Sequence, residues 1–171
     1  FILVNSCETL ACRILKNEID NANKTIDFAI YGINNQDEIY NSLLKAQERG
    51  VKIRWVTDFD NRNQNYYEDS LKLQKKIVNY KTDADYVNSN KYAIMHNKFF
   101  IFDNKKVWTG SSNITSTDLT GFNANYSVLI ESQPLAKIYT DEFNQMYNGN
   151  FHKLKKVINN KSLVLLDSTN I

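Results

Sequence analysis

Cysteine, histidine, proline and glycine are all scarce in this sequence. Its 171 residues include two cysteines, two histidines, one proline and five glycines. No Cys-x-x-Cys pair occurs and the two histidines lie far apart, so no local motif has the ligand spacing of a structural zinc site. We therefore expect no metal and no other cofactor. No linker-like stretch divides the chain, which predicts a single domain over residues 1–171. The part beyond about 159 is expected to form either one more strand or a frayed end.

The two cysteines are expected to be free thiols. Cys7 and Cys12 lie in a segment that reads as the beginning of a helix. Their spacing on a helix points the two side chains to different faces, so the sulfur atoms are predicted to stay apart.

Long apolar runs and a strong charge imbalance are also lacking. No stretch approaches the length needed to cross a bilayer, and we expect a soluble protein, either cytoplasmic or exported. The apolar opening at residues 1–4 is predicted to be a strand. The formal net charge is +2, which argues against a polybasic arm but allows a local basic groove that attracts phosphates.

Short apolar runs alternate with amphipathic segments through the first half of the chain, a pattern typical of α/β domains. This pattern predicts strands at residues 25–31 and 51–56 and helices at residues 8–19, 36–49 and 67–78. Two polar segments between them are predicted to be loops. Residues 58–65 follow a strand, where α/β proteins place ligands, and are expected to border a site. Residues 81–90 are expected to contain one short strand near Tyr86.

The second half has a different pattern. Two apolar segments, 95–102 and 106–111, flank a short polar turn, which predicts a β-hairpin. An antiparallel pair inside an α/β pattern implies a mixed sheet. A strand at 126–131 and a helix at 134–147 complete the pattern. The predicted fold class is therefore α/β, with a mixed β-sheet flanked by helices on both faces.

The first strand of this hairpin carries residue types suited to phosphoryl chemistry. Side chains alternate along a strand, so His96 and Lys98 are predicted to share one face. A neutral imidazole is a competent nucleophile at phosphorus, and an ammonium group can stabilise the charge of a five-coordinate transition state in place of a metal ion. Taken alone, a histidine on a strand is more often structural, so the prediction depends on the motif that follows.

That second motif is Gly110-Ser111-Ser112-Asn113, which leaves the second strand of the hairpin. Pairing of the two strands brings these residues alongside the His96 end of the first strand. They add hydroxyl, amide and backbone N–H donors to the imidazole and the ammonium. The two segments together predict a cradle for a phosphoryl group.

The spacing His-x-Lys-x-x-x-x-Asp at residues 96–103, with Gly-Ser-x-Asn at residues 110–113, resembles the signature of the phospholipase D superfamily. The likeness extends over most of the chain, from the strand at 26–31 to the segment 123–147. This resemblance implies a phospholipase D-like α-β-α sandwich and a metal-independent phosphodiesterase.

The resemblance also implies a role for each residue of the motif. His96 is expected to form a phosphohistidine intermediate. Lys98, Ser111 and Asn113 are expected to hold the phosphate oxygens. Asp103 completes the catalytic motif but is expected to order it from further back, without touching substrate.

One position departs from the family pattern. Many members have a glutamate that orients the nucleophilic histidine just after the asparagine that Asn123 resembles, but residues 124–126 contain no carboxylate. Asn125 is the expected substitute, although an amide brings no charge to the imidazole. Ser112 is a second expected supporting residue. Glu131 is expected to lie too far along its strand to replace the glutamate.

A single copy of the motif implies a second chain. In the family, a histidine from a second copy protonates the leaving oxygen and then activates water. The other histidine here, His152, has no partner motif around it and is expected to face solvent. We therefore expect a C2 homodimer with His96 of each chain across a shared cleft. A fragment of a longer two-motif enzyme is the alternative.

Nucleic acid, DNA or RNA, is the expected substrate, because the single-motif dimeric relatives are mostly nucleases. The predicted function is a metal-independent, non-specific endonuclease. Cations and tyrosines expected to contact the backbone or bases are Arg54, Arg62, Lys91, Tyr66, Tyr67 and Tyr92. A phospholipase D-type lipid hydrolase is the alternative, but no amphipathic helix or apolar rim next to the motif favours it. The intact motif argues against a non-catalytic binding module.

Overall fold

A mixed six-stranded sheet forms the centre of the protein. The computed structural model describes residues 7–59, 67–84, 86 and 92–158, so the predictions for residues 1–4 and for the part beyond 159 lie outside the described residues. The strand order is β4-β3-β1-β5-β6-β8. The strands are β1 (Thr25–Ile30), β3 (Lys52–Thr57), β4 (Tyr80–Thr82), β5 (Lys98–Phe102), β6 (Lys106–Gly110) and β8 (Ser127–Glu131).

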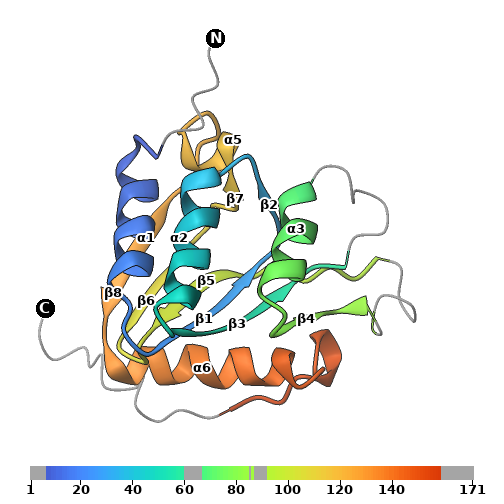
Figure 1. Ribbon diagram of the computed structural model, residues 1–171. Helices are drawn as coiled ribbons and strands as arrows, with labels where there is room; N and C mark the ends of the chain where they lie inside the picture. The colour runs from blue at the N-terminus through green and yellow to red at the C-terminus, as the bar shows by residue number, and fades with distance from the viewer. Residues whose placement is uncertain (1–6, 60–66, 85, 87–91, 159–171) are drawn as a thin grey trace, which may run out of the picture.

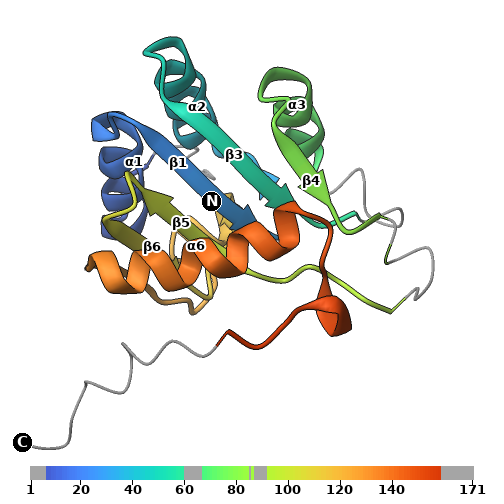
Figure 2. The ribbon, with the colours of Figure 1, turned by 90° about the horizontal axis from the view of Figure 1, so that it is seen from below.

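Helices cover both faces of this sheet (Figure 1). Three helices, α1 (Leu10–Asn21), α2 (Asp37–Glu48) and α3 (Glu68–Lys76), lie on one face, and α6 (Gln133–Tyr147) crosses the other, as Figure 2 shows from below. The predicted α/β class is confirmed. Among the described residues, no helix is both long and apolar enough to cross a bilayer.

The sheet is mixed for the reason that the sequence indicates. Strands β1, β3 and β4 run parallel, whereas β5 pairs antiparallel with β1 and with β6. The β5–β6 hairpin turns over the three residues between the paired Phe102 and Lys106. The first two, Asp103 and Asn104, have the positive φ angles of a type I′ turn, 51° and 55°. Because β5 is antiparallel to β1, its first residue lies at the sheet edge where β1 and β3 end.

Alternating side chains give the sheet two cores. Phe28, Trp55 and Phe100 pack under α1, α2 and α3, and the Phe28 and Phe100 rings stack with centroids 4.6 Å apart. Phe99 and Phe143 belong to the second core, between the sheet and α6. Strands β1 and β5 are buried on both faces, so they hold the edge residues that follow or precede them in fixed positions.

A second, two-stranded sheet lies over the end of β1. Strand β2 (Ile33–Asn34) pairs in parallel with β7 (Ile114–Thr115), which leads into the short helix α5 (Ser116–Leu119). This pairing fixes the segment after β6 above the end of β1. The strand expected near Tyr86 is instead β4, which ends at Thr82.

The expectation of free thiols is wrong, because Cys7 and Cys12 form a disulfide. Helix α1 begins only at Leu10, with Thr9 as its N-cap, so Cys7 precedes the helix. The chain before the cap turns back, and the two Cα atoms lie 5.1 Å apart, within the range that a disulfide spans. A helical phase argument therefore does not apply to this pair.

Candidate active site

His96 and Lys98 lie at the edge where β1 ends and β5 begins. Lys98 is the first residue of β5 and pairs with Ile30, the last residue of β1. His96 was predicted to lie on this strand, but it precedes the strand by two residues. The pairing of β5 with β1 begins at Lys98 and Ile30 and does not extend to His96. The Lys98 ammonium turns back and donates to the His96 carbonyl oxygen at 3.0 Å. His96 is exposed and Lys98 is only 7% exposed.

The side chains of His96 and Lys98 converge on one aromatic ring. Tyr31, the residue after β1, meets the His96 imidazole edge to face with ring centroids 4.9 Å apart. The Lys98 Nζ lies 5.7 Å from the centroid of the same ring, within cation–π distance. The imidazole and the ammonium therefore share one surface, as predicted. The prediction relied on the alternation of side chains along a strand, but His96 lies outside the strand.

The surroundings favour the neutral imidazole. Partial burial lowers the pKa of His96, and the nearby Lys98 ammonium lowers it further. A neutral imidazole carries the free lone pair that attack on phosphorus requires. Burial also lowers the pKa of Lys98, while the carboxylate of Asp118 opposes that shift by stabilising the ammonium. The site thus combines a neutral imidazole with a largely buried lysine.

Asp118, which sequence reasoning missed, joins the two motifs. It lies in α5, where its carboxylate accepts the Asn113 backbone N–H at 2.8 Å and the Asn123 amide at 2.6 Å. Thr115 caps α5 by accepting the Asp118 N–H, and this Thr-x-x-Asp spacing was the available sequence signal. That signal locates a helix start but does not indicate that the carboxylate lies near a lysine.

The serine and asparagine motif after β6 is held mainly by the segment around β8. Ser111 Oγ donates to Asn125 Oδ1 at 2.8 Å and accepts the Tyr126 N–H. Ser112 Oγ lies 3.1 Å from Ser127 Oγ. The buried Asn113 Oδ1 has no hydrogen-bond partner among the described residues.

Asn125 therefore supports Ser111, and it makes no hydrogen bond to His96 in the described structure. Glu131 lies at the other end of β8, opposite Lys106, as expected from its distance along the strand. Among the described contacts of the His96 imidazole, no carboxylate replaces the missing glutamate. The ring that packs against the imidazole is Tyr31.

Asp103 lies at the opposite end of β5 from Lys98. Its carboxylate accepts the backbone N–H groups of Asn23, Lys24 and Thr25 at 2.7–3.0 Å, at the entry to β1. Five residues of strand separate it from Lys98, or about 15 Å. This position agrees with a residue that orders the hairpin without touching substrate.

Comparison with known proteins places this arrangement in a family. The family model described as "Cardiolipin synthase, PLD-like domain" matches residues 15–147, which include both motifs. The chain belongs to the phospholipase D superfamily. The phospholipase D of Rickettsia conorii is 36% identical over 127 residues, which cover 74% of this chain and 59% of that protein. The chain thus spans about three fifths of the length of the curated relatives it matches.

Two solved structures share the fold over most of the length of this chain. The phospholipase D family member Nuc from Salmonella typhimurium has a TM-score of 0.66 and 27% identity, covering 80% of this chain and 86% of that one. NucT from Helicobacter pylori has a TM-score of 0.64 and 26% identity, covering 81% and 88%. The α-β-α arrangement of the superfamily is therefore confirmed for this chain.

A hollow also lies on the α6 side of the candidate site, the face to which Asn97 points. It has a volume of about 420 Å³ and lies beside the motif, between the β5–β6 edge and α6. Its wall includes His96, Lys98 and Gly110 from the motif and Glu142 from α6. Asn97, which points opposite to its neighbours, donates to Glu142 at 3.3 Å. Among the described residues, no group of three or more His, Cys, Asp or Glu side chains gathers as metal ligands would.

The residues that were predicted to contact the backbone or bases of nucleic acid do not all lie near the motif. Tyr67 is near the site, with its ring 5.2 Å from Tyr31. Arg54 is not, because it forms a two-pronged ion pair with the buried Asp27 and stacks on α6. Tyr92 is described and exposed. The predictions for Arg62, Tyr66 and Lys91 lie outside the described residues.

The expectation that His152 faces solvent is wrong. Its side chain is 27% exposed, and Nε2 lies 3.5 Å from the fully buried Asp83 carboxylate. The ring also packs on Tyr86, with centroids 4.5 Å apart. A short 3₁₀ turn after α6, His152–Leu154, brings the histidine back to the end of β4, which the local sequence pattern did not indicate.

Proposed function

We propose that this superfamily member is a metal-independent, non-specific endonuclease that cleaves phosphodiester bonds through a phosphohistidine at His96. One observation carries the proposal: the His96 imidazole and the Lys98 ammonium meet on the Tyr31 ring, and the surroundings keep that imidazole neutral. A nucleophile and a cation are thus held together where a phosphate can enter from solvent.

The reaction proceeds in two displacements at phosphorus. In the first, a lone pair of the His96 imidazole forms a P–N bond and the P–O bond to the leaving group breaks. The leaving oxygen takes a proton from a general acid. In the second, water attacks phosphorus, gives its proton to the same group, now a base, and the P–N bond breaks. Lys98, Ser111 and Asn113 stabilise the charge on the phosphate oxygens in both steps.

A second copy of the chain supplies the acid and base. The chain contains one other histidine, and His152 is engaged with Asp83 at the end of β4, three strands away from β5. We infer a homodimer in which His96 of the partner subunit fills this role.

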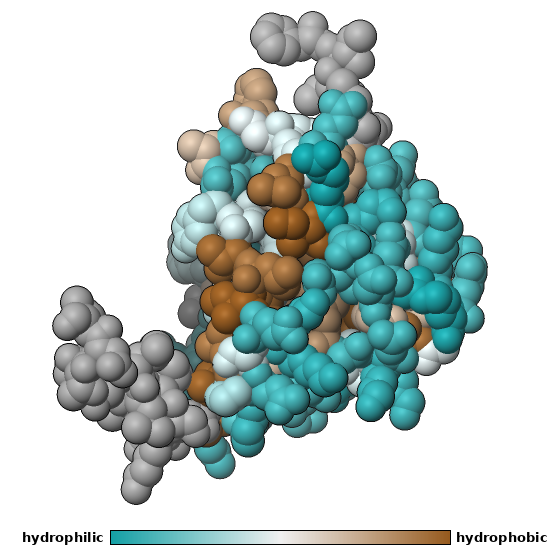
Figure 3. Space-filling view, turned by 90° about the vertical axis from the view of Figure 1, so that its left-hand side faces the viewer, coloured by the Kyte–Doolittle hydropathy of each residue, from teal (hydrophilic) through white to brown (hydrophobic). Residues whose placement is uncertain are grey.

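The surface next to the motif suits such a pairing. Strand β8 is an edge strand, and Phe122, Tyr126, Val128 and Ile130 on and before it are between 38% and 75% exposed. Figure 3 shows hydrophobic side chains gathered on the face that carries β8. Tyr126 also donates its N–H to Ser111, so this apolar surface adjoins the proposed phosphate site.

Two observations point to different phosphodiesters. The neighbours Nuc and NucT cover most of this chain and have names that suggest nucleases, which favours nucleic acid. The curated Rickettsia relatives are named phospholipase D, which favours a lipid hydrolase as the second candidate. The chain covers 86% and 88% of the two nuclease-like chains but 59% of the curated ones, so the nuclease is the stronger analogy.

One assay separates these alternatives. The purified chain is incubated in EDTA with plasmid DNA, with RNA and with phospholipid vesicles, alongside His96→Ala and the control His152→Ala. Nucleic acid cleavage that survives EDTA, disappears in His96→Ala and persists in His152→Ala supports the proposal. Cleavage of lipid alone contradicts the substrate, and loss of all cleavage in EDTA contradicts the mechanism.

A further inference from the structure

A groove outside the catalytic motif follows the β3–β4 side of the sheet. Two hollows, of about 560 Å³ and about 590 Å³, share Tyr147 at the end of α6 as a common wall. The larger reaches the beginning of β3, and the other reaches the end of β4 and the turn after α6. We call the two together the β4 groove. None of its lining residues belongs to the catalytic motif.

The charge of the β4 groove has one sign. Lys52, Lys76 and Lys81 line it, all three are exposed, and none forms an ion pair within the described part of the chain. Among the residues that the structure describes, no aspartate or glutamate lines either hollow. Arg54 lies there too, but Asp27 neutralises it. Three uncompensated ammonium groups in a chain of net charge +2 make this a concentrated basic surface.

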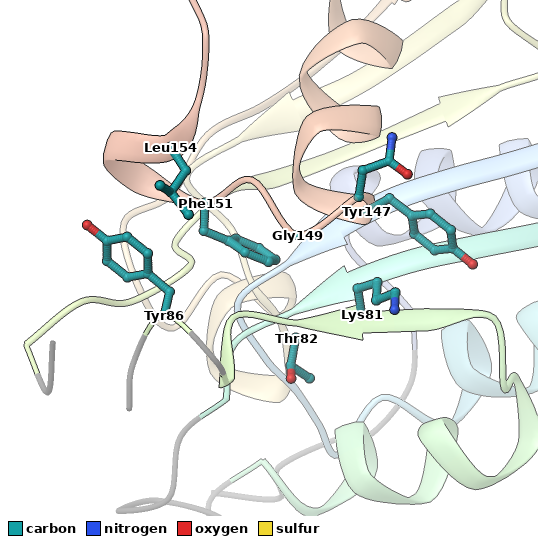
Figure 4. A pocket seen from close by; sticks show the side chains of 8 residues that line it. Lys81, Thr82, Tyr86, Tyr147, Gly149, Phe151 and Leu154 are labelled. Atoms are coloured by element: carbon teal, nitrogen blue, oxygen red, sulfur yellow. The ribbon is translucent and has the colours of Figure 1, made fainter. Parts of the chain in front are cut away.

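Aromatic rings stand between these cations. Figure 4 shows Tyr147 from α6 beside Lys81 from β4, with Phe151 and Tyr86 further along the hollow. Tyr147 stacks on Phe143, so its ring is held in place by the helix that carries it. Fixed aromatic rings beside lysines are the combination that binds single-stranded nucleic acid, because every base has a face that can stack.

The spread of the cations indicates a polymer. Val56 pairs with Lys81, and Lys52 lies four residues before Val56 on β3, so the two lysines stand about 13 Å apart along the strands. That distance spans several nucleotides of a stacked strand, which rises about 3.4 Å per nucleotide along its axis.

The β4 groove is also within reach of the motif. Strand β4 lies three strands from β5, which is about 14 Å at the usual strand spacing. The end of β4 and the beginning of β5 are at the same edge of the sheet, because β4 is parallel to β1 and β5 is antiparallel to it. Between the strands, the gap corresponds to about four stacked nucleotides. The bound strand has to pass around this edge of the sheet, because the Lys81 and Lys98 side chains point to opposite faces.

We propose that the β4 groove binds the single strand that flanks the scissile phosphate, with phosphates on its lysines and a base on Tyr147. This proposal rests on the nuclease function proposed above. It predicts that long substrates bind more tightly than short ones and that their binding weakens with salt.

Binding is measured by fluorescence anisotropy with a labelled oligothymidylate of about 16 nucleotides. The His96→Ala background keeps the probe intact. The test variant carries Lys52→Gln, Lys76→Gln and Lys81→Gln. The control carries Lys24→Gln, Lys45→Gln and Lys137→Gln, three exposed lysines that do not line the groove.

The test variant is expected to bind the probe more weakly and to reduce the slope of log affinity against log salt by about 2, at about 0.7 per lysine on single strands. The control variant keeps the wild-type slope. Tyr147→Leu is expected to weaken binding about fivefold, whereas Tyr147→Phe, which keeps the ring, leaves it unchanged. Equal slopes in the test and control variants would overturn the groove assignment.

Cleavage then separates the two proposals. With His96 present, the test variant is expected to lose kcat/KM on the oligonucleotide but to hydrolyse the small diester bis(p-nitrophenyl) phosphate at the wild-type rate. If His96-dependent cleavage of the oligonucleotide is undiminished in the test variant, the β4 groove is wrong and the nuclease stands. If the wild type cleaves no nucleic acid, the nuclease proposal itself fails.

Discussion

The Asp103 side chain offers a way to separate a positioning role from a catalytic one. It ties the β5–β6 turn to the entry of β1 through three backbone N–H groups, and it has a φ angle of 51°. Asp103→Gly removes the acceptor and tolerates that φ angle. Asp103→Ala removes the acceptor and adds backbone strain. Asp103→Asn keeps a neutral acceptor, and asparagine readily adopts this positive φ angle.

The expected losses follow from the exposure of the donors. A hydrogen bond to a charged group contributes about 1.5–3 kcal/mol, but Asn23 and Lys24 are exposed, so water replaces the carboxylate at their N–H groups. Only the Thr25 N–H is partly buried. We expect Asp103→Gly to lower the free energy of unfolding by about 2–3 kcal/mol. Asp103→Ala should cost about 1 kcal/mol more, and Asp103→Asn less than either.

Urea denaturation followed by fluorescence measures these losses, because Trp55 and Trp108 are buried. The pH dependence gives a second check. Burial acts to raise the pKa of Asp103, but the N–H donors of Asn23, Thr25 and Lys24 outweigh it, and its pKa lies below the usual value. Its stabilisation is therefore complete above about pH 4 and is lost as the pH falls through the lower folded pKa. The difference between wild type and Asp103→Gly should shrink over that acidic range.

The activity of the folded Asp103 variants should not fall with their loss of stability. Asp103 is about 15 Å from Lys98 along β5, so the activity per folded molecule of Asp103→Gly should equal that of the wild type. A variant with unchanged unfolding free energy and a kcat lowered by tenfold or more would refute the positioning role. So would a stability loss that does not depend on acid pH.

Three further perturbations test the site and its surroundings. Because the pKa of His96 is lowered, the acidic limb of kcat/KM that reports the free nucleophile should have its midpoint below pH 6.5, and a midpoint above 6.5 would contradict a neutral imidazole. Gly110→Ala places a Cβ 2.1 Å from the Tyr126 carbonyl oxygen, so it should cost about 1–3 kcal/mol and reduce activity, and a neutral effect in urea titrations would count against this packing. Val128→Lys on the β8 edge should dissociate the dimer in sedimentation experiments and abolish cleavage, whereas Val157→Lys, at an apolar position that is 93% exposed, should do neither.

The sequence pattern was sufficient for the sheet and for the position of the motif. Apolar runs at residues 25–31, 95–102 and 106–111 predicted β1, β5 and β6, and the polar turn between the last two predicted the antiparallel pairing of β5 with β6. The helix predicted at residues 36–49 is α2, and Gly50 follows its end with a φ angle of 88°. These signals are local, because each depends on neighbouring residues along one element.

The failures are contacts between segments that are distant along the chain. Asp118 lies close enough to influence the pKa of Lys98 because β7 pairs with β2, two short strands whose sequences carry no strand pattern. A turn after α6 brings His152 next to Asp83. Arg54 on β3 forms an ion pair with Asp27 on the neighbouring parallel strand β1. Such contacts depend on tertiary placement, which residue type and spacing do not encode.

The disulfide illustrates a different limit. The helix was expected to begin near Glu8, but its N-cap is Thr9, and this small shift moves Cys7 off the helix. Helix boundaries are the least certain part of a sequence pattern, and a conclusion that depends on helical phase changes with them. His96 shows the same effect at a strand, since it precedes β5 by two residues.

The most direct test of the central claim is chemical trapping of the His96 adduct. The enzyme is quenched in alkali during turnover of an oligonucleotide in EDTA, and its peptides are analysed by mass spectrometry. We predict a nucleotide joined through its phosphate to the peptide that contains His96, and none in His96→Ala. An adduct on His152 instead, or cleavage by His96→Ala at the wild-type rate, would contradict the proposed nucleophile.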